Sequence, residues 1–336
     1  MGSKPANGRK KSKSIEPVSV ARTDTVSLAD IDTQDSTFRI TTRSQLEDLL
    51  DTLPSFGLLH PPVLIENTSG YSVVCGFRRI AACRQLRWKS LSARILTDAQ
   101  DRFQIARLAI ADNILQRPLN LIETSRALNL LIDTSQDHQQ LKEAALVLGL
   151  PVNPAVVKKL EQICRLEIRI QEGILSDTIN LSMALELGKM DAQDAEMLVT
   201  LFNRLKLGLN KQRELLLFVT EIAKREDISI RQLIAEPPLQ DILKNTDLDR
   251  ATRRQQIRSM LRQRRYPAIT EAEANYQKQV RQLKLGKHIQ LLAPRDFEGT
   301  TYALTLHFKN EQDLGDLNAK INKLLEHPAL GKILKH

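Results

Sequence analysis

The hydrophobic pattern of the first hundred residues alternates between strand-like and helix-like stretches. Short β-branched and apolar runs flank a Thr-Ser-Gly turn, as in a β-hairpin, whereas other segments repeat an apolar residue every third or fourth position, as in a half-buried helix. We therefore expect extended runs at 26–28 and 38–40, a helix capped by Ser44 and Glu47 and ended by Pro54 and Gly57, hairpin strands at 62–66 and 71–75, a helix at 77–86 and a strand at 91–95. These elements form a small mixed α/β unit.

The pattern after Asp98 is helical almost to the end of the chain. The expected helices cover 99–115, 120–132, 138–148, 153–164, 176–187, 192–205, 211–225, 229–235, 250–265 and 270–285. The last fifty residues return to strands at 288–292 and 300–308, followed by a helix at 311–325. The predicted fold class is α+β and multidomain, mostly helical, with a small mixed α/β N-terminal domain, an all-helical middle and a ββα C-terminal module.

Composition and charge narrow the classes of partner. The chain has 336 residues, more than one compact domain usually needs, and 49 Lys and Arg against 40 Asp and Glu give a net charge of +9. This surplus favours a polyanionic partner. Aromatic residues are only 4% of the chain, which argues against a groove that stacks single-stranded bases and favours contacts to phosphates.

Several function classes lack the residues they need. No apolar run is long enough to span a membrane, and the N-terminus is polar and basic rather than a signal sequence. Cys75, Cys83 and Cys164 form no CxxC pair, the histidines are scattered, and no GxxxxGK[ST] loop occurs. We therefore expect a cytoplasmic protein with no membrane partner, no metal site of its own and no P-loop ATPase activity.

The stretch around Gly76 has the features of an anion site. A predicted strand leads into this glycine, and a helix begins at once with Arg78 and Arg79. Unpaired amides at a helix start and the helix dipole favour negative charge, and arginines add paired donors for phosphate oxygens. An arginine pair at a helix start is also common on solvated surfaces, so this motif alone leaves both interpretations open.

Three short segments resemble the N-terminal domain of the ParB family of partition proteins. The family reads G-x-x-Q-P, then G-E-R-R-x-x-A, then E-N-x-x-R before L-N-P-I-E. This chain has Gly57-Leu-Leu-His60-Pro61, then Gly76-Phe77-Arg78-Arg79-Ile80-Ala81-Ala82, then Asp112-Asn113 with Arg117 before Leu119-Asn120-Leu121-Ile122-Glu123. The resemblance implies a CTP-binding domain that also uses Mg²⁺. The implied nucleotide-binding residues are Gly57, His60, Gly76, Arg78, Arg79, Asp112, Asn113 and Arg117.

The departures from the family pattern concern catalysis more than binding. Phe77 stands where the family has an acid, His60 where it has Gln, and Gln116 where it has the third arginine, with Arg117 one place later. Since Phe77 can neither bind Mg²⁺ nor orient water, we expect no efficient CTP hydrolysis and assign no catalytic residue. The related sulfiredoxins carry a reactive cysteine at the position of Phe77, so that thiol reaction is not expected, and no acid or His cluster supports a nuclease.

The segment 141–160 has the pattern of a helix-turn-helix. Gly149 suits the turn, Asn153 and Pro154 suit the cap and first position of a second helix, and Lys158 and Lys159 lie on its outward face. A generic helical hairpin would show the same pattern, but the position matches the central domain of the ParB family. We predict double-stranded DNA contacts from Asn153, Lys158 and Lys159 with loose base specificity, because no arginine is present to read guanine.

Two features near the C-terminus have open interpretations. Arg250, Arg254, Arg258 and Arg262 recur every fourth residue and form a basic stripe, which either contacts a DNA backbone, through Arg254 and Arg258 above all, or pairs with acids of the same fold. Alternating apolar residues from Tyr302 to Phe308 need a covering surface. The covering surface is a second copy, as in the ββα dimerisation module that closes ParB chains, or another part of this chain.

Together these observations predict five segments. They are a disordered basic tail at 1–22, a ParB/sulfiredoxin-like nucleotide-binding domain at 23–115, a helical DNA-binding domain at 116–236, an Arg-rich connector at 237–275 and a ββα dimerisation module at 276–336. The resulting hypothesis is a CTP-responsive homodimeric DNA clamp at the nucleoid, with a partition ATPase as a candidate partner. The alternative is a helix-turn-helix transcriptional or mobile-element regulator without nucleotide control.

Overall fold

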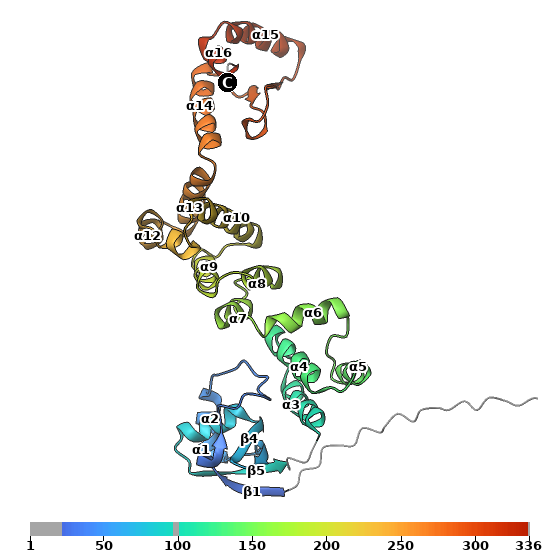
Figure 1. Cartoon of the computed structure of the whole chain (residues 1–336). Helices are drawn as coiled ribbons and strands as arrows, with labels where there is room; N and C mark the ends of the chain where they lie inside the picture. The colour runs from blue at the N-terminus through green and yellow to red at the C-terminus, as the bar shows by residue number, and fades with distance from the viewer. Residues whose placement is uncertain (1–21, 97–100, 335–336) are drawn as a thin grey trace, which may run out of the picture. The chain divides into compact units, whose positions relative to one another are not determined.

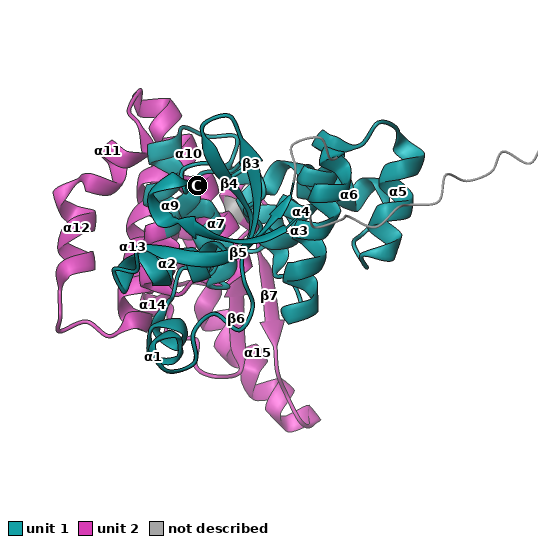
Figure 2. Ribbon diagram, turned by 90° about the horizontal axis from the view of Figure 1, so that it is seen from below, with its two compact units in different colours: residues 1–199 teal, residues 200–336 magenta. Residues whose placement is uncertain are grey.

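The computed structural model describes residues 22–96 and 101–334, and the chain divides into two compact units (Figure 2). Unit 1 comprises residues 1–199 and unit 2 comprises residues 200–336. The predicted basic tail lies, except for Arg22, outside the described residues. Among the described residues, no helix has the length and apolar character needed to cross a membrane.

Unit 1 begins with a five-stranded sheet in the order β1-β5-β3-β4-β2. Its strands are β1 (Arg22–Ser27), β2 (Ile31–Asp32), β3 (Val63–Asn67), β4 (Gly70–Cys75) and β5 (Ser90–Leu96). The predicted hairpin is confirmed, because β3 and β4 pair in antiparallel fashion from Val63 with Cys75 to Asn67 with Gly70. β5 runs parallel to β3 and antiparallel to β1, so it links the hairpin to the first strand.

Two helices contribute to the core of this sheet domain, α1 (Glu47–Phe56) and α2 (Phe77–Gln85) (Figure 1). Leu64 of β3, Ile80 of α2 and Ile95 of β5 are fully buried in one apolar cluster. The predicted capping box at Ser44 and Glu47 is wrong, since α1 starts after Leu46 and has no side-chain cap.

Two details of the first sixty residues differ from the prediction, the end of α1 and the segment 38–40. Pro54 lies inside the last turn of α1, and Gly57 with a φ of 67° ends this helix. The segment 38–40 is not a strand. Its Phe38 and Ile40 side chains are nevertheless buried, which explains their strand-like pattern.

The rest of unit 1 is helical. It contains α3 (Arg102–Gln116), α4 (Leu121–Thr134), α5 (His138–Val147), α6 (Pro154–Ile163), α7 (Ile168–Leu175), α8 (Leu181–Leu187) and the first part of α9 (Ala192–Leu205). α4 is central to this group, because it packs against α3, α5, α6 and α7. α3 also contacts β4, which joins the helices to the sheet domain.

Unit 2 combines helices with one small hairpin. It contains α10 (Leu209–Glu226), α11 (Ile230–Ala235), α12 (Pro237–Lys244), α13 (Arg250–Arg265), α14 (Pro267–Leu283), β6 (Ile289–Leu292), β7 (Ala303–Leu306), α15 (Glu311–Leu325) and α16 (Pro328–Leu334). The pattern did not predict α7, α12 or α16. Pro237 and Pro238, read as a boundary, instead occupy the first turn of α12, where a missing N–H costs nothing. Over the described residues, the mostly helical fold class with its small N-terminal sheet is confirmed.

Candidate nucleotide and nucleic-acid sites

One cavity of unit 1 brings the three sequence motifs together. It has a volume of about 860 Å³ and lies against α1, the start of α2 and the end of α3. Every nucleotide-binding residue predicted from the sequence lines it, namely Gly57, His60, Gly76, Arg78, Arg79, Asp112, Asn113 and Arg117. These residues come from segments up to sixty positions apart, so only the fold places them around one space.

Gly76 lets the backbone turn from β4 directly into α2. Its φ is 93°, and a Cβ at this position would lie 2.8 Å from the Pro62 Cβ. A glycine also has no side chain to cap the helix, so the first N–H groups of α2 have no side-chain acceptor from the N-cap. The helix start therefore presents donors at a point that lines the cavity, which is the local arrangement that anions favour.

The Arg79 side chain contacts residues of both other motifs. Its guanidinium donates to the His60 and Pro61 carbonyl oxygens and forms an ion pair with Asp112 at 3.5 Å. Only 17% of the side chain is exposed. An arginine held at this depth by two carbonyls and one carboxylate is positioned to exchange that carboxylate for a phosphate oxygen, because both are anionic acceptors of similar geometry.

Arg78 is held on the other wall of the cavity by α1 and the residues before it. It donates to the Gln45 carbonyl oxygen at 2.6 and 2.9 Å and to Asp48 at 2.5 Å. Arg78 and Arg79 therefore each carry a carboxylate partner. A bound polyanion would have to compete with Asp48 and Asp112 for these two guanidinium groups.

Arg117 forms a strong structural contact that the sequence analysis did not anticipate. Its guanidinium donates to both oxygens of fully buried Glu123, at 2.6 and 2.7 Å, and Glu123 also accepts from the backbone N–H groups of Thr42 and Asn120. Burial alone would raise the pKa of Glu123, but these donors outweigh it and lower that pKa to about 2. Arg117 thus ties the end of α3 to the capping box of α4 as well as lining the cavity.

Phe77 takes part in the core rather than in chemistry. Its ring packs against the apolar cluster of the sheet domain, and the Arg39 guanidinium carbon lies 5.9 Å from the ring centroid. Nearby Cys75 is buried, and burial raises the pKa of its thiol far above the ordinary value, so this thiol is unreactive at neutral pH.

The cavity suits a triphosphate better than it suits a metal ion by itself. Its carboxylates, Asp48 and Asp112, are both paired with arginine. In the part of the chain that the structure describes, no group of three or more His, Cys, Asp or Glu side chains could hold a metal. A Mg²⁺ ion at this cavity would take most of its oxygen ligands from nucleotide phosphates and water, as Mg²⁺ commonly does.

The predicted helix-turn-helix segment folds as two helices, α5 and α6, joined by a turn. Gly149 has a φ of 66° in that turn, and the Asn153 side chain caps α6 by accepting from the Ala155 N–H at 3.0 Å. Lys158 and Lys159 are exposed on α6, as expected. Asn153 is therefore a cap first, and DNA contact by Asn153, Lys158 and Lys159 stays a prediction.

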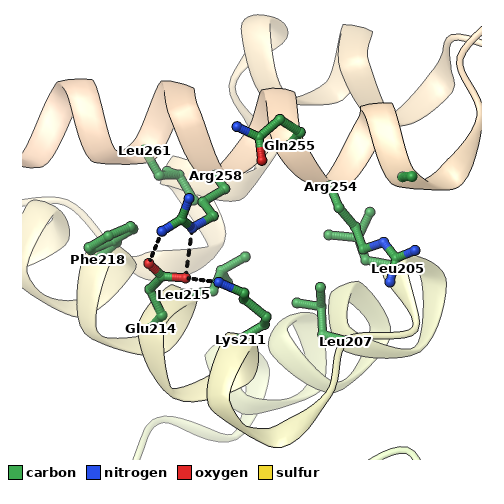
Figure 3. Close-up of a pocket in the computed structure, with 11 residues that line it drawn as sticks. Leu205, Leu207, Lys211, Glu214, Leu215, Phe218, Arg254, Gln255, Arg258 and Leu261 are labelled. Carbon is green, nitrogen blue, oxygen red and sulfur yellow. Dashed lines mark hydrogen bonds and ion pairs between the residues drawn. The ribbon is translucent and has the colours of Figure 1, made fainter. Parts of the chain in front are cut away.

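Two of the four arginines of the basic stripe on α13 are paired with acids of unit 2. Arg258 donates to both oxygens of Glu214 at 2.7 and 2.8 Å (Figure 3), and Arg262 pairs with Glu273. Beyond the stripe, the same helix pairs Arg264 with Glu226 and Glu236, and Arg265 with Glu221. The second interpretation therefore describes Arg258 and Arg262, and DNA contact by the stripe stays a prediction. The acids on α10 were the missing signal, since Glu214, Glu221 and Glu226 fall on a helix that packs against α13.

The C-terminal hairpin is partly covered by its own chain. β6 and β7 pair in antiparallel fashion, and the Tyr302 hydroxyl donates to the Ile333 carbonyl oxygen at 3.0 Å. Leu304 and Phe308, however, are 41% and 53% exposed. Apolar surface thus remains on this hairpin, and the predicted homodimer stays a prediction.

Comparison with known proteins identifies relatives of part of the chain. The family model of the ParB N-terminal domain matches residues 11–114. The nucleoid occlusion protein of Oceanobacillus iheyensis is 28% identical over 173 residues, 51% of this chain and 58% of that protein. The probable chromosome-partitioning protein ParB of Helicobacter pylori is 21% identical over 177 residues, 53% of this chain and 59% of that protein. The chain thus spans just over half the length of these relatives.

Solved structures of similar proteins cover a comparable part. A C-terminally truncated ParB of Caulobacter crescentus complexed with CTP-gamma-S matches with 18% identity and a TM-score of 0.25, covering 54% of this chain and 98% of that one. A Pnob8-like ParB-N domain matches with 15% identity and a TM-score of 0.34, covering 67% and 94%. The three motifs thus line one cavity, and residues 11–114 of this chain are similar to the ParB N-terminal domain.

Proposed function

We propose that this chain is a ParB-like DNA-binding protein that acts in DNA segregation or nucleoid organisation and binds CTP in its N-terminal cavity. The observation that carries the proposal is the position of Arg79, which contacts His60 and Asp112 and so joins the three motifs at one point. The relatives named above are chromosome-partitioning and nucleoid occlusion proteins, which supports the same role. Its place of action would be the nucleoid, within the cytoplasm.

In this proposal the triphosphate lies at the start of α2. The N–H groups after Gly76 donate to phosphate oxygens, and Arg78 and Arg79 leave Asp48 and Asp112 to pair with the phosphates instead. Since each guanidinium exchanges one anionic partner for another, binding needs no unpaired charge in the cavity. The family resemblance selects CTP, with Mg²⁺ held mainly by the phosphates.

Hydrolysis is not part of the proposal. Phe77 replaces the acid of the family motif and packs into the core, so it cannot accept a proton from water or bind a metal. Of the carboxylates in the three motifs, Asp112 is the one that lines the cavity, and its ion pair with Arg79 favours a role as a charge partner. Bound CTP would therefore act by its presence rather than by turnover.

The proposed DNA surface is α6. Lys158 and Lys159 are exposed there, and lysines contact phosphates with little dependence on base sequence. Arg258 is a weaker candidate, because it already binds Glu214 through two hydrogen bonds, whereas Arg254 has no such partner and stays a candidate for phosphate contact. A second copy bound at Leu304 and Phe308 would complete a dimeric clamp. A partition ATPase as partner rests on the family resemblance alone.

One observation favours the alternative, a helix-turn-helix regulator without nucleotide control. Arg78, Arg79 and Arg117 all have carboxylate partners within the protein, so the cavity is electrostatically satisfied without a ligand. If no nucleotide replaces these partners, the α5–α6 segment would bind DNA unassisted. The two functions differ in a single measurable property, the affinity for CTP.

Equilibrium binding of labelled CTP to the full chain, with and without double-stranded DNA, separates the two functions. We expect saturable CTP binding by the wild type and a loss of about tenfold or more in Arg79→Gln, because one charge-assisted phosphate contact disappears. Arg87→Gln is the matched control, since Arg87 is exposed and lies outside the cavity. DNA binding by a wild type that does not bind CTP would establish the regulator instead.

A further inference from the structure

A second cavity lies in unit 2, between the end of α9, the first half of α10 and α13 (Figure 3). Its volume is about 250 Å³. The walls are mainly apolar, and the residues that form them are Leu205, Leu207, Leu215, Phe218 and Leu261. It opens to solvent beside Ala251 and Gln255, which are both exposed on α13. No sequence motif pointed to this cavity.

The side chains that line this cavity carry more positive than negative charge. Three cations line it, Lys211, Arg254 and Arg258, against one carboxylate, Glu214. Glu214 is already shared, because it accepts from Arg258 at 2.7 and 2.8 Å and from Lys211 at 3.3 Å. The cavity therefore carries a surplus of positive charge next to apolar walls.

Arg254 holds much of that surplus. In Figure 3 its guanidinium lies at the opposite end of the cavity from the Arg258–Glu214 pair. Its Nε donates to the Arg250 carbonyl oxygen of the same helix at 3.2 Å. In the ranges that the structure describes, no carboxylate lies within ion-pair distance of Arg254. Asp249, which caps α13 through the Thr252 N–H, lies beyond that distance, although the Arg254 charge is one of the causes that lower its pKa.

We propose that this cavity binds a small amphipathic organic anion, with its apolar body against Leu207, Leu215 and Phe218 and its carboxylate at Arg254. The volume has room for roughly eight water-sized groups, which suits an aliphatic or aromatic acid of about six to eight carbons. Burial of the body supplies the affinity, and the charge-assisted hydrogen bonds of the head group supply the specificity.

The positive charge of this cavity and its apolar lining argue against other classes of ligand. An organic cation would meet like charges from Lys211 and Arg254. A DNA phosphate is hydrated and has no apolar portion for Leu215 and Phe218 to contact. A neutral apolar molecule would fill the volume but give the Arg254 guanidinium no anionic partner within the cavity. An acid with a short apolar body satisfies both the walls and the surplus charge.

Isothermal titration of the full chain with octanoate tests the proposal, with octanol and octylamine as neutral and cationic ligands of the same chain length. We expect one octanoate per chain, and octanol and octylamine binding at least about tenfold more weakly. Arg254→Gln should weaken octanoate binding about tenfold, and Ala251→Phe should weaken it by filling the opening. Arg250→Gln is the matched control, with the same charge change on the same helix but outside the cavity.

Three outcomes would overturn the proposal. They are the absence of saturable octanoate binding, equal affinity for octanoate in Arg254→Gln and the wild type, and octanol binding as tightly as octanoate. The last outcome would indicate an apolar groove for a partner side chain without anion recognition. CTP binding is independent of all three, because the nucleotide cavity lies in unit 1 and this cavity lies in unit 2.

Discussion

The ion pair of Arg117 with Glu123 should contribute strongly to the stability of unit 1 at neutral pH. Glu123 is fully buried, and its pKa falls from 4.5 to about 2 in the folded chain. At about 1.4 kcal/mol for each pKa unit, this depression corresponds to about 3 kcal/mol of stability. Glu123→Gln removes the charge and leaves Arg117 without its partner, so we expect a loss of about that size at pH 7.

The pH dependence gives the sign of the effect. Because the folded-state pKa is depressed, the stability is fully present above pH 4.5 and is lost as the pH falls toward 2. The difference between wild type and Glu123→Gln should therefore be largest at pH 7 and should drop below half of that by about pH 3.

Urea unfolding followed by tryptophan fluorescence measures this difference. The chain has a single tryptophan, Trp88, which packs against the core of the sheet domain. Glu123 reaches that domain through the Thr42 N–H, so its loss should shift the Trp88 transition. Glu143→Gln on the exposed face of α5 is the control, with an expected change under about 0.5 kcal/mol. A wild-type advantage that is equal at pH 7 and pH 3 would refute the argument from the charge of Glu123.

Three further predictions follow from the two candidate sites. Phosphate release from CTP should stay at background in the presence of Mg²⁺ and DNA, because Phe77 has no carboxylate to bind Mg²⁺ or to orient water. Steady turnover in a coupled phosphate assay would contradict this prediction. The Lys158→Ala/Lys159→Ala variant should bind DNA more weakly than the wild type. Because two phosphate contacts are lost, the slope of log affinity against log salt concentration should decrease in magnitude by about 2. An unchanged slope would place the DNA surface elsewhere. Gly76→Ala should lose about 1–3 kcal/mol in urea unfolding from backbone strain and from the close approach of the new Cβ to the Pro62 Cβ. Gly149→Ala, at a position that also has a positive φ but open space around it, should lose less. Equal losses in the two variants would contradict a cost of the contact with Pro62.

The sequence predicted best those features whose cause is local. Apolar alternation and the turn at 68–70 determine the β3–β4 hairpin, and the strand, glycine and arginine sequence around Gly76 determines the start of α2. Asn153 and Pro154 likewise cap and begin α6 as expected. In each case the residues that carry the signal are adjacent in the chain, so no distant contact is needed to interpret them.

The sequence misled where a distant contact decides the outcome. Ser44 has capping-box spacing with Glu47, yet the segment before α1 instead supplies the Gln45 carbonyl oxygen to Arg78. The residues 38–40 look like a strand because Phe38 and Ile40 are buried by other elements, not because they pair in a sheet. Pattern alone cannot distinguish an apolar residue in a strand from one in a buried loop.

The sequence by itself determined most helical and strand segments, the anion-favouring start of α2 and the similarity of residues 11–114 to the ParB N-terminal domain. Only the tertiary structure decided which charges are paired. α10 places Glu214 beside Arg258, and α4 presents buried Glu123 to Arg117, which also lines the nucleotide cavity. Arg254, in contrast, lines a cavity of unit 2, and none of the described carboxylates lies within ion-pair distance of its guanidinium. The physical reason is that an arginine acts through its nearest anion, and that anion is usually far away in the sequence.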